Sequence, residues 1–501
     1  MKAPRSLLLF ASLVLAGPSD AATLRVAIPA LPASLGVPFT AVGQPSTATW
    51  SALFDALTRL EPDGSLKPAL ATAWAPVNPR LWRFTLRNDV KFHDGTPLTA
   101  QAVADSLAIL RTKEAAKFYL ASEMTHLKAI RATGPLTLEV ETDVPDAILP
   151  RRMSILPIVS AAAWAMKGEA GFAQAPVGTG PYKLVDWGRG SGSAKLSAAA
   201  DSWRKPNIDA LELIPLDSAI SRLQALMSGR VDVAARMNNE DIAPAKDGGF
   251  KLASLEAPQV LSLAFKLAGG NPKSPVADQR VRQAMSMALN RPGIATQILQ
   301  GLAKPTGQAA SSNTVGYTAD IPVPPYDPER AKALLKEAGY GSGVTLTAEV
   351  MVGVSPADDL IYQQVVQDLG RIGVAVTLRT IPYAVWLRKY SANDWAGDMF
   401  SLTWDSSSFY DVIRVIGNAS CAKPSPFFCD ATLTPVIAAV DAEMDESKRL
   451  RALQALNARY ATLAPALFLV TVSHHYGYTP KIRTLSLRNS GVVYEGVTFN
   501  P

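Results

Sequence analysis

The sequence predicts an α/β fold with mixed sheets, because strand-like runs alternate with helical patterns along the chain and several helical patterns begin at a recognisable capping residue. Short runs rich in β-branched and aromatic side chains are typical of strands. Such runs occur at Leu24–Ile28, Trp82–Leu86, Thr137–Val140 and Val374–Leu378. They are spread over nearly the whole length, so we expect sheets in every part of the molecule.

Helices are predicted from the residues at their ends. A Thr or Asp side chain just before a helix accepts a hydrogen bond from a free backbone N–H of the first turn. Proline suits the first turn, and glycine suits the position after the last turn. On these signals we expect helices at Ala100–Leu110 after Thr99, at Val281–Leu289 after Asp278, and at Glu329–Ala338 between Asp327-Pro328 and Gly339.

Residues 1–22 are predicted to be a cleavable signal peptide. Lys2 and Arg5 precede an apolar run, Leu7–Gly17, and small residues follow it up to Ala22. This order of a basic, an apolar and a small-residue region is typical of secretory signals. A membrane helix needs about 20 apolar residues, so a retained signal anchor is the weaker alternative. No cysteine follows the cleavage region to carry a lipid, and we therefore expect a free protein in the periplasm.

Composition indicates a large globular protein and argues against a nucleic-acid partner. The 501 residues are 48% hydrophobic and 18% charged, which is typical of a chain with a substantial core. A chain of this length exceeds what one core usually organises, so two or three substructures are expected. The net charge of +6 is spread along the chain without Lys/Arg runs, and this distribution does not favour nucleic-acid binding.

The two cysteines, Cys421 and Cys429, enclose a short Pro-containing loop. In an exported protein we expect them to form a local disulfide. Two free thiols would be unusual outside the cytoplasm. A zinc site is disfavoured, because CxxC spacing is absent and no histidine lies near in sequence.

A series of motifs runs through nearly all of the mature chain. In their order and spacing they resemble the extracellular solute-binding proteins of family 5, which serve ATP-driven (ABC) importers of dipeptides, oligopeptides, nickel and glutathione. The motifs are Leu57–Gly64, Pro68–Trp74, Val90–Val103, Val177–Tyr182, Leu223–Val233, Val281–Arg291 and Tyr326–Tyr340.

The resemblance implies a two-lobed periplasmic binding protein fold of type II, of the large class with an extra subdomain. Lobe I would consist of residues 23–45, 183–257 and 476–501, the extra subdomain of residues 46–182, and lobe II of residues 258–475. The chain would cross between the lobes near Pro258–Leu261 and Val472–His475. A few backbone torsions at these hinges would absorb closure around a ligand.

The resemblance also points to a ligand-binding segment in lobe II, Met399–Asp411. Peptide-binding members carry a Trp followed by a motif with two Asp residues, Tyr and Pro. Trp404 matches this pattern, but Ser406–Ser408 replace the acidic part, so the resemblance does not fix a peptide as the ligand. The candidate ligand-binding residues here are Trp404, Asp405, Tyr410 and Asp411. The alternative is a surface loop with Trp404 in the core of lobe II.

By the same analogy, candidates in lobe I are Ser34, Leu35, Arg236 and Met237. Arg236 could hold a carboxylate or phosphate through two parallel hydrogen bonds, or could simply be a solvated surface arginine. His474 and His475 are adjacent, and in a strand they would point to opposite faces, so they cannot chelate one metal together.

The function predicted from these observations is that of a binding protein, not an enzyme. The chain has no Gly-x-Ser-x-Gly or His-Glu-x-x-His motif, and its four histidines offer little base chemistry. We expect a monomer that passes a small peptide-like or zwitterionic solute to a membrane permease, with no cofactor and no bound metal. The alternatives are sensing, chaperone activity or uptake of a metal chelate, and a periplasmic hydrolase is the least favoured.

Overall fold

The computed structural model describes residues 22–188, 192–489 and 491–501. The predicted signal peptide therefore lies, apart from Ala22, outside the described residues. Within the described part of the chain, no helix combines the length and apolar character needed to cross a bilayer.

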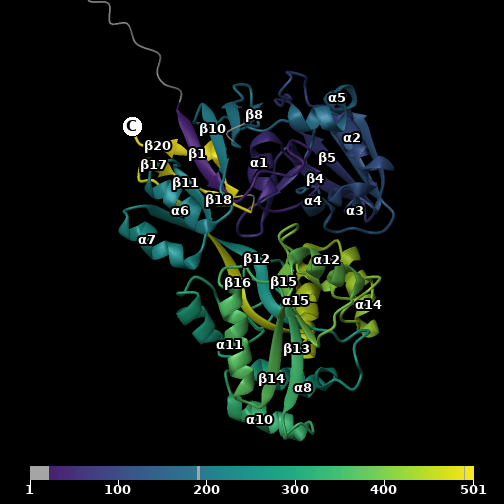
Figure 1. Ribbon diagram of the computed structural model, residues 1–501. Helices are drawn as coiled ribbons and strands as arrows, with labels where there is room; N and C mark the ends of the chain where they lie inside the picture. The colour runs from purple at the N-terminus through teal and green to yellow at the C-terminus, as the bar shows by residue number, and fades with distance from the viewer. Residues whose placement is uncertain (1–21, 189–191, 490) are drawn as a thin grey trace, which may run out of the picture.

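The centre of the molecule is one mixed sheet that passes through both of its halves (Figure 1). Its ten strands follow the order β14-β13-β15-β12-β16-β11-β1-β10-β9-β8. The pairs β1–β10, β1–β11, β13–β14 and β13–β15 are parallel, and the others are antiparallel. The strands are β1 (Thr23–Ile28), β8 (Tyr182–Asp186), β9 (Ala194–Ala198), β10 (Ala210–Pro215), β11 (Val233–Met237), β12 (Lys251–Phe265), β13 (Val344–Val350), β14 (Val374–Thr380), β15 (Met399–Asp405) and β16 (Ala466–Tyr478).

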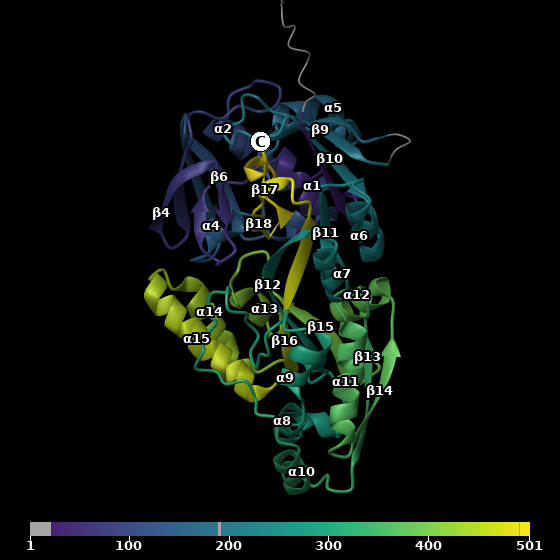
Figure 2. The same ribbon diagram turned by 90° about the vertical axis from the view of Figure 1, so that its left-hand side faces the viewer.

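The long strands β12 and β16 connect the upper half to the lower half in both views (Figures 1 and 2). They pair with each other from Lys251 opposite Tyr478 to Ala264 opposite Ala466. Their register shifts between Glu256 and Val260, which is close to one predicted hinge. The hinge roles and the exact boundaries between lobe I, the extra subdomain and lobe II stay predictions. We keep these three names for the ranges given above.

The extra subdomain contains a second sheet of four antiparallel strands, in the order β4-β5-β7-β6. Phe84, Leu138 and Val140 alternate with more exposed neighbours and point into a core shared with lobe I. The strands are β4 (Ala71–Asn78), β5 (Leu81–Leu86), β6 (Leu127–Gly134) and β7 (Thr137–Thr142). Short two-stranded sheets are formed by β2 (Thr58–Leu60) with β3 (Leu66–Pro68), β17 (Ile482–Thr484) with β20 (Thr498–Phe499), and β18 (Leu487–Arg488) with β19 (Gly491–Val492).

The helices of the upper half cover lobe I and the extra subdomain (Figure 1). The predicted cap at Thr99 is confirmed, because its side chain accepts a hydrogen bond from the backbone N–H of Ala102. The helices are α1 (Ser46–Leu53), α2 (Ala100–Ile109), α3 (Tyr119–Ser122), α4 (Leu149–Arg152), α5 (Ala161–Gln174), α6 (Ala219–Met227) and α7 (Ile242–Asp247).

The helices of the lower half surround lobe II. The caps predicted at Asp278 and Asp327 are confirmed, since their carboxylates accept from Arg280 N and Arg330 N. The helix after Asp278 begins at Gln279 and ends at Met287, two residues earlier at each end than predicted. The helices are α8 (Gln279–Met287), α9 (Arg291–Gly293), α10 (Pro328–Glu337), α11 (Asp358–Gly370), α12 (Tyr383–Ala392), α13 (Ile413–Asn418), α14 (Thr434–Ala442) and α15 (Glu446–Leu463).

The predicted disulfide is confirmed: Cys421 and Cys429 are bonded and close a loop at the edge of lobe II. Inside this loop, Phe427 and Phe428 turn into the lobe II core. The backbone carbonyl of Phe427 also accepts hydrogen bonds from Leu267 and Ala268. The cross-link therefore fixes a loop that packs against the body of lobe II.

Candidate functional site

Arg236 is the charged group that lobe I presents near the end of β11. Its backbone has a φ of 56°, in the left-handed region that a residue with a side chain rarely adopts. The side chain is half-buried, and among the described residues its guanidinium makes no hydrogen bond or ion pair. Burial lowers the pKa of Arg236, and the nearby Tyr476 and Asp405 act in the opposite direction. The structure therefore keeps a partly dehydrated cation without a bonded partner at this point.

Asp405 is a charged group of lobe II whose negative charge acts on Arg236. It is the last residue of β15, is exposed, and accepts a hydrogen bond from the backbone N–H of Ser407 at 2.8 Å. Its negative charge acts to raise the pKa of Arg236 and also those of Tyr119 and Tyr410. Among the described residues Asp405 forms no ion pair with Arg236. Opposite charges from the two lobes thus lie near each other without bonding.

His474 and His475 lie on β16 near these charges. Their side chains have different surroundings, as expected for adjacent residues of a strand. The Nδ1 atom of His475 lies 2.8 Å from the hydroxyl of Ser254. His474 instead lies near Arg236, and burial together with that positive charge keeps its pKa well below the usual range. Burial lowers the pKa of His475 to about 4. Both rings are therefore neutral at pH 7 and add no charge to the site.

A pocket between the lobes opens next to these histidines. Asn239 of lobe I forms one side, and His475 and Ser473 of β16 lie at its edge. The remaining wall belongs to lobe II and is mostly apolar, with Leu299 and Val472 among its residues. Its volume is about 10 Å³, which is room for about one water molecule.

Trp404 lies in the core of lobe II, where its side chain is 2% exposed. Its ring packs against Phe427, Tyr460 and Phe468, with centroid distances of 6.3, 6.5 and 5.1 Å. The indole Nε1 donates to the hydroxyl of Ser262 at 3.0 Å. These surroundings agree with the core alternative, and contact with a ligand stays a prediction.

Tyr410 follows in the same loop and carries a buried, unsatisfied hydroxyl. Its φ is 51°, its side chain is fully buried, and its hydroxyl has no partner among the described residues. Burial, with the charges of Asp405 and Glu61 nearby, raises its pKa, so the phenol stays protonated. An unpaired donor in a buried place is a group that a bound molecule could satisfy.

Asp411 is fully buried, and its carboxylate joins the segment after Trp404 to the rest of lobe II. One carboxylate oxygen accepts from the backbone N–H of Ile413 at 3.0 Å, and the other is paired with Arg449 of α15 at 2.6 Å. The carboxylate is therefore already neutralised by a residue of the same lobe. A direct contact of Asp411 with a ligand stays a prediction.

The other lobe I candidates have intramolecular partners. The hydroxyl of Ser34 donates to the carbonyl of Val37, and the carbonyl of Leu35 accepts from the indole of Trp50. Met237 is buried in a small apolar cluster behind the sheet. Their roles toward a ligand also stay predictions.

Sequence reasoning missed a set of contacts between the extra subdomain and the loop after Trp404. Arg414 of α13 pairs with Glu123 and also reaches Tyr119. Arg151 donates to the carbonyl of Phe409. No short motif signals these pairs, since their partners lie on distant parts of the chain.

The described residues contain no group of three or more metal-ligating side chains. His93, in the motif Val90–Val103, hydrogen bonds through Nε2 to the carbonyl of Gly180 at 3.0 Å. Burial lowers its pKa, and the hydrogen bond ties its ring to the backbone of the motif Val177–Tyr182.

Comparison with known proteins gives a family match over most of the chain. Residues 65–421 match the sequence profile described as bacterial extracellular solute-binding proteins, family 5 Middle. The chain is 28% identical over 284 residues to Di/tripeptide-binding protein 2 of Pseudomonas aeruginosa, covering 55% of this chain and 52% of that protein. It is 29% identical over 297 residues to the glutathione-binding protein GsiB of Pectobacterium atrosepticum, covering 58% and 56%. The match thus spans about half the length of these two relatives.

A solved structure with a similar fold is HbpA2 from Haemophilus parasuis. It superposes with a TM-score of 0.83 at 20% identity, covering 96% of this chain and all of the other. The likeness confirms the predicted α/β fold of the periplasmic binding protein type.

Proposed function

Since this chain belongs to the bacterial extracellular solute-binding proteins of family 5, we propose that it is the substrate-binding component of an ATP-driven importer. It captures a small peptide-like or zwitterionic solute between its lobes and delivers the solute to a membrane permease. The family description and the site both favour binding over catalysis.

The observation that carries this proposal is the unbonded pair of Arg236 and Asp405. Arg236 offers two parallel N–H donors that suit a carboxylate, and Asp405 offers acceptors for an ammonium group. A zwitterion placed between them would satisfy both charges at once. The protonated hydroxyl of Tyr410 supplies a third polar group nearby.

The molecules named for two relatives agree with a solute of this kind. Small peptides and glutathione are the molecules named for the two relatives described above. Both carry at least one carboxylate and one ammonium group. We further propose that the protein acts in the periplasm as a monomer, with the permease as its partner and without a cofactor.

Mass spectrometry of the molecule released from purified protein is the direct test, followed by calorimetry with the identified compound. A panel of dipeptides, tripeptides, glutathione, opines, sugars and metal chelates extends it by thermal shift, because a ligand that binds only the folded state stabilises that state. We expect a compound with both charges to bind. Binding limited to uncharged sugars would refute the zwitterion assignment, and turnover of any compound would refute the binding-only function.

A further inference from the structure

Arg222 of α6 is a buried arginine that binds backbone carbonyls where β11 ends. It is 4% exposed. Its Nε and one terminal nitrogen donate to the carbonyls of Ala235 and Arg236, both at 2.7 Å. The other terminal nitrogen donates to the carbonyls of Leu216 and Asp217 at 2.7 and 2.8 Å. The guanidinium therefore joins two separate segments of lobe I, the end of β11 and the residues after β10.

The carbonyls of Ala235 and Arg236 belong to a bulge in β11. The pairing of β11 with β16 shifts between Ala234 and Met237, so two residues of β11 stand opposite one residue, Tyr476, of β16. A bulge of this kind bends the strand and redirects a side chain. The left-handed φ of 56° at Arg236 falls within the bulge. Arg222 thus binds the backbone at the point that sets the direction of the Arg236 side chain.

The place of Arg222 in α6 is unfavourable for a cation without nearby acceptors. Arg222 is the fourth residue of the helix, in the first turn, where the helix dipole disfavours a positive charge. Burial lowers its pKa to about 10, and the positive charge of Arg236 acts in the same direction. Arg222 is still charged at pH 7, because the shifted pKa lies well above that value. The bonds to four carbonyls compensate for its burial beside another cation.

Arg282 of lobe II makes the same kind of contact away from the site. It is the fourth residue of α8, is 5% exposed, and has a pKa that burial lowers to about 10. It donates to the carbonyls of Val276, Ala277, Leu463 and Ala464. Joining two segments is therefore a structural task that such an arginine performs elsewhere in the chain. Arg222 differs in that one of its four carbonyls is that of Arg236.

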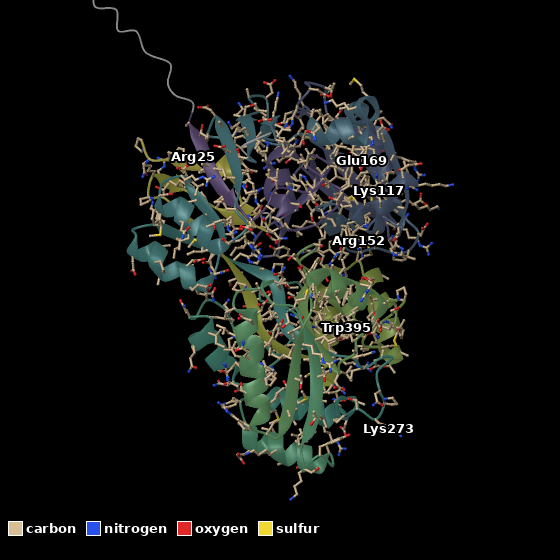
Figure 3. The ribbon with its side chains drawn as sticks, viewed as in Figure 1. Arg25, Lys117, Arg152, Glu169, Lys273 and Trp395 are labelled. Atoms are coloured by element: carbon tan, nitrogen blue, oxygen red, sulfur yellow. A yellow bond between two sulfur atoms is a disulfide. The ribbon has the colours of Figure 1, made fainter. Side chains whose placement is uncertain are left out.

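The other end of β11 is held by a different arginine. Arg25 of β1 donates to the carboxylate of Asp232, the residue before β11, from Nε at 3.1 Å and from a terminal nitrogen at 3.0 Å. Figure 3 shows Arg25 on the upper part of β1, away from lobe II. Arg25 thus supports the same strand at a distance from the bulge.

We infer that Arg222 is a positioning residue that holds the bulge of β11, directs the side chain of Arg236, and thereby sets the affinity for the carboxylate of the solute. Arg222 acts through the backbone of Arg236 and not through contact with the solute. The inference rests on the proposed function for the role of Arg236 and deepens it by naming the residue that supports that role. Lysine is a poor substitute for Arg222, since its single nitrogen lacks the planar fork that reaches both segments.

Crystal structures of the ligand-free parent and of Arg222→Lys test the position of Arg236 directly. We expect Arg236 in the variant to leave the left-handed region, or its guanidinium to move relative to β1. Arg282→Lys, matched in burial and bonding, and Arg25→Lys, on the same strand pair, should keep Arg236 as in the parent. Unfolding in urea shows whether each variant is folded, and Arg222→Gln is the second variant at this position.

Calorimetry with trialanine and its C-terminal amide tests the consequence for binding. The amide lacks the carboxylate, so the ratio of the two affinities reports the carboxylate contact and does not follow a general loss of stability. Arg222→Lys should lower this ratio about tenfold or more, as the loss of a charge-assisted hydrogen bond does. In an Arg236→Gln background it should lower the ratio no further, because both changes act on one contact. The two control variants should keep the ratio of the parent.

An unchanged Arg236 in the structure of Arg222→Lys would overturn the inference. The same displacement in Arg282→Lys would also overturn it, since the effect would then follow from the loss of any buried arginine. A ratio that falls in Arg236→Gln but stays at the parent value in Arg222→Lys would overturn it as well. A ratio that does not change in Arg236→Gln would instead refute the proposed carboxylate role of Arg236. The crystal structures need no ligand and decide the positioning of Arg236 by themselves, so the two failures are distinguishable.

Discussion

Lobe II faces the extra subdomain on one side and lobe I on the other, and the contacts at these two boundaries differ. On the side of the extra subdomain, Arg414 and Glu123 are bonded, and Phe409 is buried between arginines. On the side of lobe I, Arg236 and Asp405 lie near each other and stay unbonded. Figure 2 shows α14 and α15 of lobe II directly beneath the extra subdomain. One boundary is therefore joined by bonded side chains, whereas the other carries two opposite charges that no bond joins.

The largest effect is expected from a substitution that removes the partner of Asp411 on the bonded side. Arg449→Leu would leave the carboxylate of Asp411 buried without its partner, which typically costs about 3–5 kcal/mol. We expect the free energy of unfolding, measured in urea, to fall by about that amount. Arg451→Leu, at an exposed position of the same helix, should change it by less than about 0.5 kcal/mol. A loss in Arg449→Leu as small as in this control would mean that Asp411 is not held in the way described.

The next effect tests the unbonded side through affinity. Arg236→Gln should weaken binding of the solute found by mass spectrometry by about 2–4 kcal/mol, because it removes a charged partner from a partly dehydrated contact. Calorimetry measures this loss directly. Arg230→Gln, which removes an exposed arginine just before β11, should leave the affinity unchanged. If Arg236→Gln also left the affinity unchanged, the anionic end of the solute would have to bind at another part of the protein.

A smaller effect is expected from pH on the bonded side. Burial raises the pKa of Asp441 to about 6, although Arg152 and Arg449 act in the opposite direction, and the carboxylates of Asp146 and Asp411 add to the rise. A carboxyl group whose pKa is raised by folding stabilises the fold when protonated, and this contribution is lost as the pH rises through about 6. Between pH 7 and pH 5 this group should therefore add about 1 kcal/mol of stability.

Asp441→Asn should remove that contribution while keeping the shape of the side chain. Thermal unfolding at pH 5 and at pH 7 would show it as a smaller difference between the two conditions than in the parent. Asp247→Asn, a lobe I substitution at an exposed position, should preserve the parent difference. The same difference in Asp441→Asn and in the parent would assign the pH dependence to other groups.

The smallest effect concerns the backbone of the unbonded side. Arg236→Gly relieves a left-handed conformation and removes a half-buried charge, so the variant should be more stable than the parent by about 1 kcal/mol. Ala357→Gly, at a φ of 52°, relieves the backbone alone and should gain less. An Arg236→Gly variant that unfolds more easily than the parent would show that the guanidinium stabilises the fold and is not held in reserve for a ligand.

Local features of the fold were predictable from the sequence. The caps at Thr99, Asp278 and Asp327 act on a backbone N–H two or three residues away, so the pattern alone reveals them. The disulfide between Cys421 and Cys429 followed from short spacing and export. The family motifs predicted the architecture over nearly the whole chain.

The site was less predictable, because its properties depend on residues far apart in sequence. Asp411 resembles a free carboxylate until Arg449 of α15 is placed beside it. Trp404 is a residue type that often contacts ligands. Its burial depends on aromatic rings contributed by distant strands and loops. The pair of Arg414 and Glu123 joins two regions without any shared motif. Arg236 was proposed as a site residue by analogy with the family, and that role stays a prediction.

The path of the chain through β12 and β16 bears on how the protein acquires its structure. Both lobes share one sheet, and β16 lies at its centre beside β11 of lobe I and β12. Lobe I also needs β1 from the beginning of the chain and β17–β20 from its end. Contacts between such distant segments form slowly, since much chain entropy is lost before they are made. The three larger hydrophobic clusters each include side chains of residues 466–478, so none of these three is complete until the last part of the chain is present.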